Sequence, residues 1–198
     1  MLNISERVTF QDLKSHPLTI MQGGVTRSLL LIKIFKIDIL TTPQNTILVL
    51  GIGNILMNDE GVGIHVVSQL EKEGFTRADL MDGGTGGFHL LGFIQSYKTV
   101  IMVDAALDDF PAGHVRVLRP RYAKDFPKQL SAHEVGLKDL LDAAFLLGNM
   151  PEIHLVAVSV KDFQDMGMEL TPEIEKAIPV AVKTVKELVI STSLNDLD

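Results

Sequence analysis

The feature that most constrains the fold is an alternation of short apolar runs with longer amphipathic segments, starting at Thr46. We expect the apolar runs to be strands, at residues 46–50, 78–81, 99–103 and 153–158, with 114–118 as a further strand at or near a sheet edge. We expect helices at about 59–73, 85–97 and 134–147, and from 171 onward. Unbroken apolar strands between amphipathic helices are typical of a parallel sheet covered on both faces. The sequence therefore predicts an α/β fold, a three-layer sandwich in which a twisted, mostly parallel sheet has helices on both faces.

The length of 198 residues suits one domain with a sizeable core. We assign residues 46–198 to a single α/β domain, because no internal repeat or second periodic region interrupts them. Residues 1–45 are interpreted as an N-terminal extension, because most of this segment lacks steady periodicity and Pro43 breaks it from the first strand. The extension is either a docking arm or the result of a translation start placed too far upstream, with Met21 as the internal alternative. Periodicity does not choose between these.

Composition excludes several classes of function. The chain has no cysteine, so disulfides, zinc–thiolate sites and a thiol nucleophile are excluded. A net charge of −7 disfavours binding to nucleic acid or to an anionic membrane. The longest apolar stretch, Leu29 to Leu40, contains three charged residues and is too short to span a bilayer. With no pattern of a secretory signal at its start, we expect a cytoplasmic protein without membrane insertion.

Three residues stand where strands give way to helices. Glu60 follows the first strand and a glycine turn, Asp104 follows the run 99–103, and His133 lies in the capping sequence Ser131-Ala132-His133-Glu134. In an open α/β sheet, ligands bind beyond the carboxyl ends of the strands. Two carboxylates and an imidazole are suitable ligands for a divalent metal ion, and the positive end of a helix favours the neutral imidazole that such binding requires. The sequence therefore predicts a metal site formed by Glu60, Asp104 and His133.

Each of these residues also has an ordinary structural explanation. A glutamate in a first helical turn is favoured by the helix dipole, an aspartate often ends a strand, and a histidine in a first turn is commonly exposed. For Glu60, the neighbouring Gly61 and Gly63 favour function, because each weakens a helix by up to ~1 kcal/mol and so suggests close backbone approach. For Asp104, the five apolar residues before it predict a buried carboxylate, which needs a cation or several donors.

The glycine turn also invites comparison with a dinucleotide-binding loop. Gly51-Ile52-Gly53 matches the start of that fingerprint, but Leu56 stands at the third glycine position. The sequence has no phosphate-loop lysine either. A nucleotide binder or a small-molecule hydrolase therefore stays a less favoured alternative.

Four segments in order resemble the hydrogenase maturation proteases: Gly51–Gly63, Asp82–Thr85, Val103–Ala105 and Ser131–Leu137. The resemblance runs from about Thr46 to Leu188. It implies a twisted sheet between helices and an endopeptidase that removes a C-terminal extension from the nickel-loaded precursor of the [NiFe]-hydrogenase large subunit. The family's metal-site positions fall on Glu60, Asp104 and His133. Nickel is then carried by the precursor, and no organic cofactor is implied. The donor types suit nickel or zinc and do not choose between them.

Asp82 is the remaining candidate for a catalytic carboxylate, or else belongs to a simple turn. The loop Asp82–Thr85 is predicted to position the substrate tail through backbone donors, and Thr85 to cap the helix that follows. The loop 119–130 is either a flank for the large subunit or ordinary solvated surface. The alternative to a protease is a chaperone or nickel-sensing module that binds the same precursor without cleaving it.

Overall fold

The computed structural model describes residues 45–120, 129–130, 150–162 and 166–195. The predicted extension apart from Asn45, the residue His133 and the helix predicted at 134–147 lie outside the described residues. All of the described residues belong to the unit that begins at Pro43.

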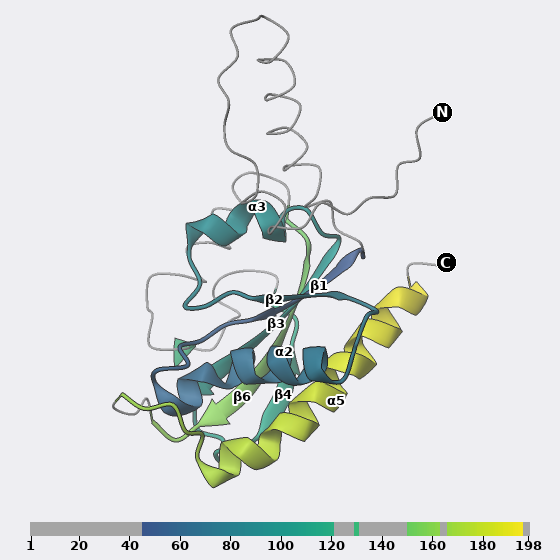
Figure 1. Cartoon of the computed structure of the whole chain (residues 1–198). Coiled ribbons are helices and arrows are strands. Elements are labelled where there is room, and N and C mark those ends of the chain that lie inside the picture. Colours follow the sequence, from purple (N-terminus) through teal and green to yellow (C-terminus); the bar gives the residue numbers. More distant parts are fainter. Residues whose placement is uncertain (1–44, 121–128, 131–149, 163–165, 196–198) are drawn as a thin grey trace, which may run out of the picture. The chain divides into compact units, whose positions relative to one another are not determined.

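A mixed sheet forms the centre of this unit (Figure 1). Its strand order is β2-β1-β3-β6-β4, with β5 paired to β3 off this path. β1, β2, β3 and β6 are parallel, whereas β4 runs antiparallel to β6 and β5 antiparallel to β3. The strands are β1 (Ile47–Gly51), β2 (Asp79–Asp82), β3 (Thr99–Leu107), β4 (Val115–Leu118), β5 (Gln129–Leu130) and β6 (Glu152–Val160). The predicted parallel sheet, and the position of residues 114–118 near an edge, are confirmed.

Helices cover both faces of the sheet. On one face, α2 (Val62–Lys72) and α5 (Pro172–Asn195) pack on odd-numbered residues of β3 such as Ile101 and Val103. On the other face, the 3-10 helix η2 (Phe88–Leu90) and α3 (Leu91–Ile94) pack on even-numbered residues such as Met102. The alternation follows from the period of two along a strand. It confirms the predicted three-layer arrangement. Of the helices that the structure describes, none combines the length and apolar character needed to cross a membrane.

Several element boundaries differ from the predicted ones. β3 continues to Leu107, so Asp104 lies inside the strand and not after it. The helix predicted from Asp59 starts as a 3-10 turn, η1 (Asn58–Gly61), and becomes α-helical at Val62. Thr85 does not cap a helix, because a turn continues through Gly86 and Gly87, whose φ angles are 80° and 126°. These positive angles are incompatible with a right-handed helix, which explains why η2 begins later than predicted.

Candidate functional site

The strand order has a topological switch point between β1 and β3, where open α/β sheets form a crevice. From β1 the chain passes through α2 to β2 on one side of β1, whereas β3 lies on its other side. Ligands bind at such a switch point, beyond the carboxyl ends of the two strands. Glu60 follows β1 and Asp104 lies on β3. The two predicted carboxylates therefore come from the elements on either side of this crevice.

Asp104 lies at a gap in the pairing of β3. β1 pairs with β3 as far as Val103, and β5 pairs with it from Ala106 onward. Asp104 and Ala105 fall between these partners, while the opposite edge of β3 pairs with β6 without interruption. The Asp104 side chain is fully buried, and its Oδ1 accepts a hydrogen bond of 2.8 Å from the amide of Ala105. The predicted burial of this carboxylate is confirmed.

Close backbone contacts hold Glu60 beside the strand ends. A Cβ atom added to Gly53, whose φ is 140°, would lie 1.9 Å from the carbonyl oxygen of Glu60. A Cβ atom added to Gly63 would lie 2.1 Å from the carbonyl oxygen of Val103. Only glycine fits where backbones approach so closely. The close backbone approach that was predicted at Gly63 is thus confirmed. Glu60 itself is 1% exposed.

The neighbouring Asp59 is a buried residue that the sequence reading did not single out. Its carboxylate accepts hydrogen bonds from the amide and hydroxyl of Thr171, at the start of α5. One residue earlier, the amide of Asn58 donates to the carbonyl oxygen of Gly167 at 2.9 Å. The turn that carries Glu60 is therefore tied to the chain after β6. No local pattern predicts a contact across more than one hundred residues. The sequence did show an acidic pair at residues 59 and 60, but not the partner of the first.

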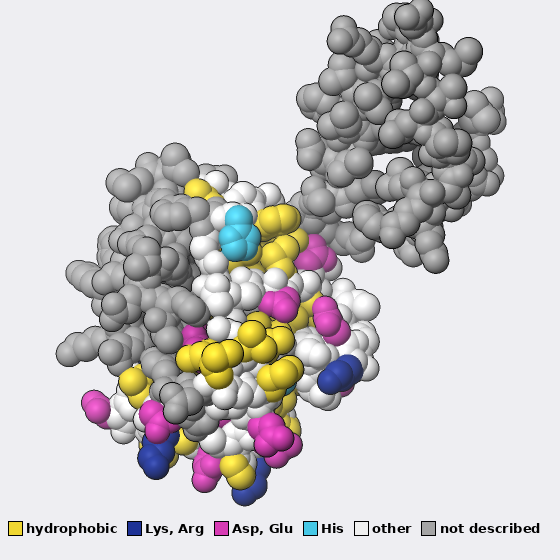
Figure 2. All heavy atoms as spheres, turned by 60° about the vertical axis from the view of Figure 1, so that its left-hand side comes forward, with side chains coloured by type: hydrophobic (Ala, Val, Ile, Leu, Met, Phe, Trp, Pro, Cys, Tyr) yellow, Lys and Arg dark blue, Asp and Glu magenta, His cyan; other side chains and the backbone are white. Residues whose placement is uncertain are grey.

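Apolar side chains are exposed on these same two loops. The amide of Gly167 donates to the carbonyl oxygen of Leu56 at 2.8 Å, which holds the loops side by side. Large hydrophobic residues of both loops are exposed: Ile55, Leu56, Met166 and Met168. We call them the apolar rim. Figure 2 shows hydrophobic side chains gathered on one face, with acidic side chains around them. Such a group next to a crevice is typical of a binding surface.

Asp82 lies at the carboxyl end of β2, opposite Gly51 of β1. It is exposed, and its Oδ1 accepts a hydrogen bond of 2.8 Å from the amide of Gly84. The loop it begins is fastened to the glycine turn, because the amide of Gly53 donates to the carbonyl oxygen of Gly84 at 2.8 Å. Asp82 therefore stabilises a turn, and the loop borders the same end of the sheet as Glu60 and Asp104.

The set of Glu60, Asp104 and His133 stays a prediction, because His133 lies outside the described residues. Within the part of the chain that the structure describes, no group of three or more His, Asp and Glu side chains is placed to hold a metal ion. Asp82 consequently does not join Glu60 and Asp104 as a third ligand.

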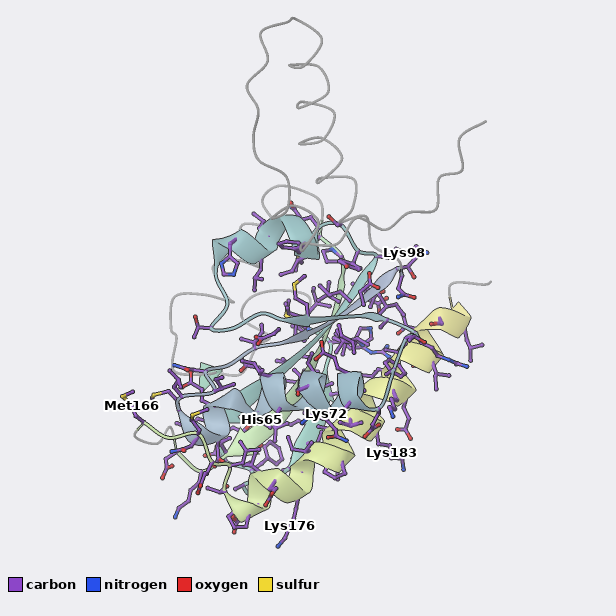
Figure 3. All side chains as sticks on the ribbon, in the orientation of Figure 1. His65, Lys72, Lys98, Met166, Lys176 and Lys183 are labelled. Carbon is purple, nitrogen blue, oxygen red and sulfur yellow. The ribbon has the colours of Figure 1, made fainter. Side chains whose placement is uncertain are left out.

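Two other described histidines lie within regular elements. His65 is on α2 (Figure 3), where burial, and then the charge of Lys72, lower its pKa from 6.5. His154 is buried near the amino end of β6, with its Nε2 3.0 Å from Oε1 of Glu152. Neither lies on the segments that form the crevice.

Comparison with known proteins identifies the family. Residues 64–188 match the family model of the hydrogenase maturation proteases. The chain is 35% identical over 147 residues to the hydrogenase expression/formation protein HupD of Rhizobium leguminosarum bv. viciae, covering 72% of this chain and 73% of the relative. It is also 33% identical to the hydrogenase 2 maturation protease of Escherichia coli K12, covering 70% and 87%. The chain belongs to the hydrogenase maturation proteases.

Solved structures agree with this membership. The hydrogenase maturating endopeptidase HybD from Escherichia coli superposes with a TM-score of 0.66 at 32% identity, covering 74% of this chain and 93% of that one. The [NiFe] hydrogenase maturation protease HybD from Thermococcus kodakarensis gives 0.62 at 27% identity, covering 72% and 98%. The resemblance predicted from four short segments is therefore confirmed, and this maturation protease has the α/β fold of its family.

Proposed function

We propose that this maturation protease cleaves the C-terminal extension from the nickel-loaded precursor of the [NiFe]-hydrogenase large subunit. We propose further that Glu60, Asp104 and His133 recognise the nickel carried by that precursor. The observation that carries the proposal is the burial of Glu60 and Asp104, at 1% and 0% exposure, on the two elements that border the crevice. Buried carboxylates favour a cationic partner.

The pairing of β5 supports His133 as the third ligand. Leu130 pairs with Ala106, two residues beyond Asp104. His133 follows Leu130 by three residues, and three residues of chain reach at most about 11 Å. This short stretch of chain after Leu130 supports the proposal of His133 as a ligand. Its nitrogen would complete a mixed oxygen and nitrogen donor set, which nickel accepts.

The proposed selectivity follows because the precursor and the protease would each supply some of the ligands of the nickel ion. Nickel bound by thiolates of the precursor would gain Glu60, Asp104 and His133 as further ligands only when the precursor docks. A precursor without nickel would instead bring no cation to two buried carboxylates, and docking would be disfavoured. The nickel supplies Lewis acidity that polarises the scissile carbonyl or activates water.

The surroundings of the crevice suit a protein substrate. The apolar rim offers side chains that pack against an apolar segment, and its two methionines adapt to different shapes. On the other side, the loop after Asp82 contains three glycines at positive φ, and no atom lies within 4 Å of a Cβ added to Gly84 or Gly86. We propose that this loop positions the precursor tail through its backbone, and that Asp82 is the candidate catalytic carboxylate.

Processing of defined precursors tests the proposal. The purified protease is incubated with nickel-loaded, zinc-loaded and metal-free large-subunit precursor, and the products are measured by mass spectrometry. We expect loss of the C-terminal extension with nickel only. Cleavage of all three forms would refute nickel recognition. Stable binding without cleavage would favour the chaperone or nickel-sensing alternative.

A further inference from the structure

Ser159 shares a face of the sheet with Asp104. β3 and β6 are parallel and in register, with Asp104 opposite Ala157 and Ala106 opposite Ser159. Side chains two residues apart on one strand point to the same face. Ala106 and Ala157 both belong to the core on the α3 side, so Asp104 and Ser159 point to that side as well. The four residues form a square, with Asp104 and Ser159 at opposite corners.

Small side chains occupy the other two corners. Toward the amino ends of β3 and β6, the same face is filled by bulky side chains such as Met102 and Leu155. At the square, the remaining corners carry only the methyl groups of Ala106 and Ala157. Neighbouring strands lie about 4.8 Å apart, and residues two apart along a strand are separated by about 6.6 Å. The diagonal between the Cα atoms of Asp104 and Ser159 is therefore about 8 Å. One water molecule hydrogen-bonded to both polar side chains spans that separation.

The Ser159 hydroxyl has an unmet requirement for a partner. Its Oγ is buried and makes no hydrogen bond to any residue that the structure describes. The backbone of Ser159 is satisfied, because its amide donates to the carbonyl oxygen of His114 and its carbonyl oxygen accepts from Gly113. A buried hydroxyl without a partner destabilises a protein, whereas an apolar residue like the adjacent Val158 and Val160 avoids that cost. Destabilising polar residues inside a core typically have a functional reason.

We propose that Ser159 is a positioning residue for Asp104. Its hydroxyl donates a hydrogen bond to a water molecule, which in turn donates to the Asp104 carboxylate and fixes its orientation in the crevice. This role rests on the function proposed above for Asp104. Ser159 itself does not touch the substrate.

Two variants of equal shape test the role of the hydroxyl. Ser159→Thr and Ser159→Val both place a β-branched residue in the strand, and they differ only by a hydroxyl against a methyl group. We expect Ser159→Thr to process nickel-loaded precursor within about twofold of the wild type. The kcat of Ser159→Val should fall roughly threefold to tenfold with KM unchanged, as expected for loss of one hydrogen bond. Its melting temperature should exceed that of Ser159→Thr, because a methyl group needs no partner.

The combination of lower kcat and higher stability separates positioning from a structural role. Thr99→Val is the matched control, since Thr99 is a buried hydroxyl residue at the amino end of β3, about 16 Å from Asp104 along the strand. It should leave kcat unchanged. Equal kcat values for Ser159→Thr and Ser159→Val, whether unchanged from the wild type or reduced, would overturn the proposal.

A crystal structure provides a readout that does not depend on catalysis. We expect a water molecule within about 3.2 Å of both Ser159 Oγ and an Asp104 carboxylate oxygen in the wild type, and its loss in Ser159→Val. Absence of that water in the wild type would refute the role of Ser159. If the wild type shows the water but leaves nickel-loaded precursor uncut, the proposed function fails and the link between the two residues stands.

Discussion

The carboxylate of Asp59 accepts two hydrogen bonds from Thr171, one from its amide at 2.7 Å and one from its hydroxyl at 2.8 Å. Asp59 is 2% exposed and stands directly before Glu60. Thr171 stands directly before the first residue of α5. The turn that carries one candidate ligand is therefore held by the beginning of the last helix. Two charge-assisted hydrogen bonds in a buried place make this tie strong.

Removing the tie should destabilise the protein and impair the site. We expect Asp59→Ala to lower the free energy of unfolding by about 2–4 kcal/mol, because it breaks both bonds and leaves donors of Thr171 without a partner. Processing should also fall, because Glu60 loses its support. Thr171→Val keeps the backbone bond and should cost only about 1 kcal/mol. Urea unfolding measures both values. Wild-type stability in Asp59→Ala would contradict the importance of the tie.

The contact between Gly63 and Val103 should tolerate no side chain. Gly63→Ala places a Cβ atom 2.1 Å from the carbonyl oxygen of Val103, so α2 must move away from β3. We expect a loss of about 3 kcal/mol or more in unfolding free energy. Gly92→Ala is the control: no atom lies within 4 Å of its added Cβ, and alanine should stabilise α3 by about 0.4–1 kcal/mol. Similar stabilities of the two variants would show that the close approach is unimportant.

Neutral isosteres test the two carboxylates of the crevice. We expect Glu60→Gln and Asp104→Asn to reduce processing of nickel-loaded precursor at least about a hundredfold, since even indirect supports of metal ligands contribute 10–100-fold. Circular dichroism should show folded protein in both cases. Asp109→Asn, an exposed carboxylate in the loop after β3, should process normally. Full activity of either crevice variant would remove that residue from the site.

The lowered pKa of His65 predicts a loss of stability in acid. Burial, and then the charge of Lys72, disfavour the protonated ring in the folded state, so the pKa lies below its value of 6.5 in the unfolded chain. The unfolded chain then binds the proton more readily, and stability present above pH 6.5 is lost as the pH falls through the folded-state pKa. His65→Gln should therefore lose less melting temperature between pH 7 and pH 5 than the wild type.

Lys72→Gln separates the two causes of this shift. This substitution removes the charge of Lys72 and leaves the burial of His65, so the pKa of His65 should rise. The loss of melting temperature between pH 7 and pH 5 should then become smaller without disappearing. Melting curves at the two pH values give the comparison. An equal loss in wild type and His65→Gln would exclude His65 as the titrating group.

Much of the fold is predictable because the apolar runs are long and each is flanked by polar turns. Residues 47–50 and 153–158 are buried strands for that reason, and Gly63 signalled the close backbone contact. The end of β3 was misplaced because its last residues are held by pairing with β6, a partner that follows much later in the sequence. Local pattern carries no information about that partner.

The site was predictable only in part for the same reason. Glu60 and Asp104 were found because runs of apolar residues precede them in the sequence, and their burial is confirmed. The role of Asp59 depends on Thr171, and the position of Ser159 beside Asp104 depends on the register of two strands. Thr85 was misread as a cap because the effect of Gly86 and Gly87 on the turn was underestimated. Such relationships arise from distant pairing and appear only when the chain is folded.

The insertion of β6 between β3 and β4 has a consequence for synthesis on the ribosome. β3 and β4 are both synthesised before β6, yet the two strands are not neighbours in the sheet. At about 5–20 residues per second, the ribosome needs roughly 2 to 8 seconds to extend from β4 to the end of β6. During that interval the apolar segment of β3 lacks its partner β6, and an unpaired strand edge is a target for chaperones that bind extended segments.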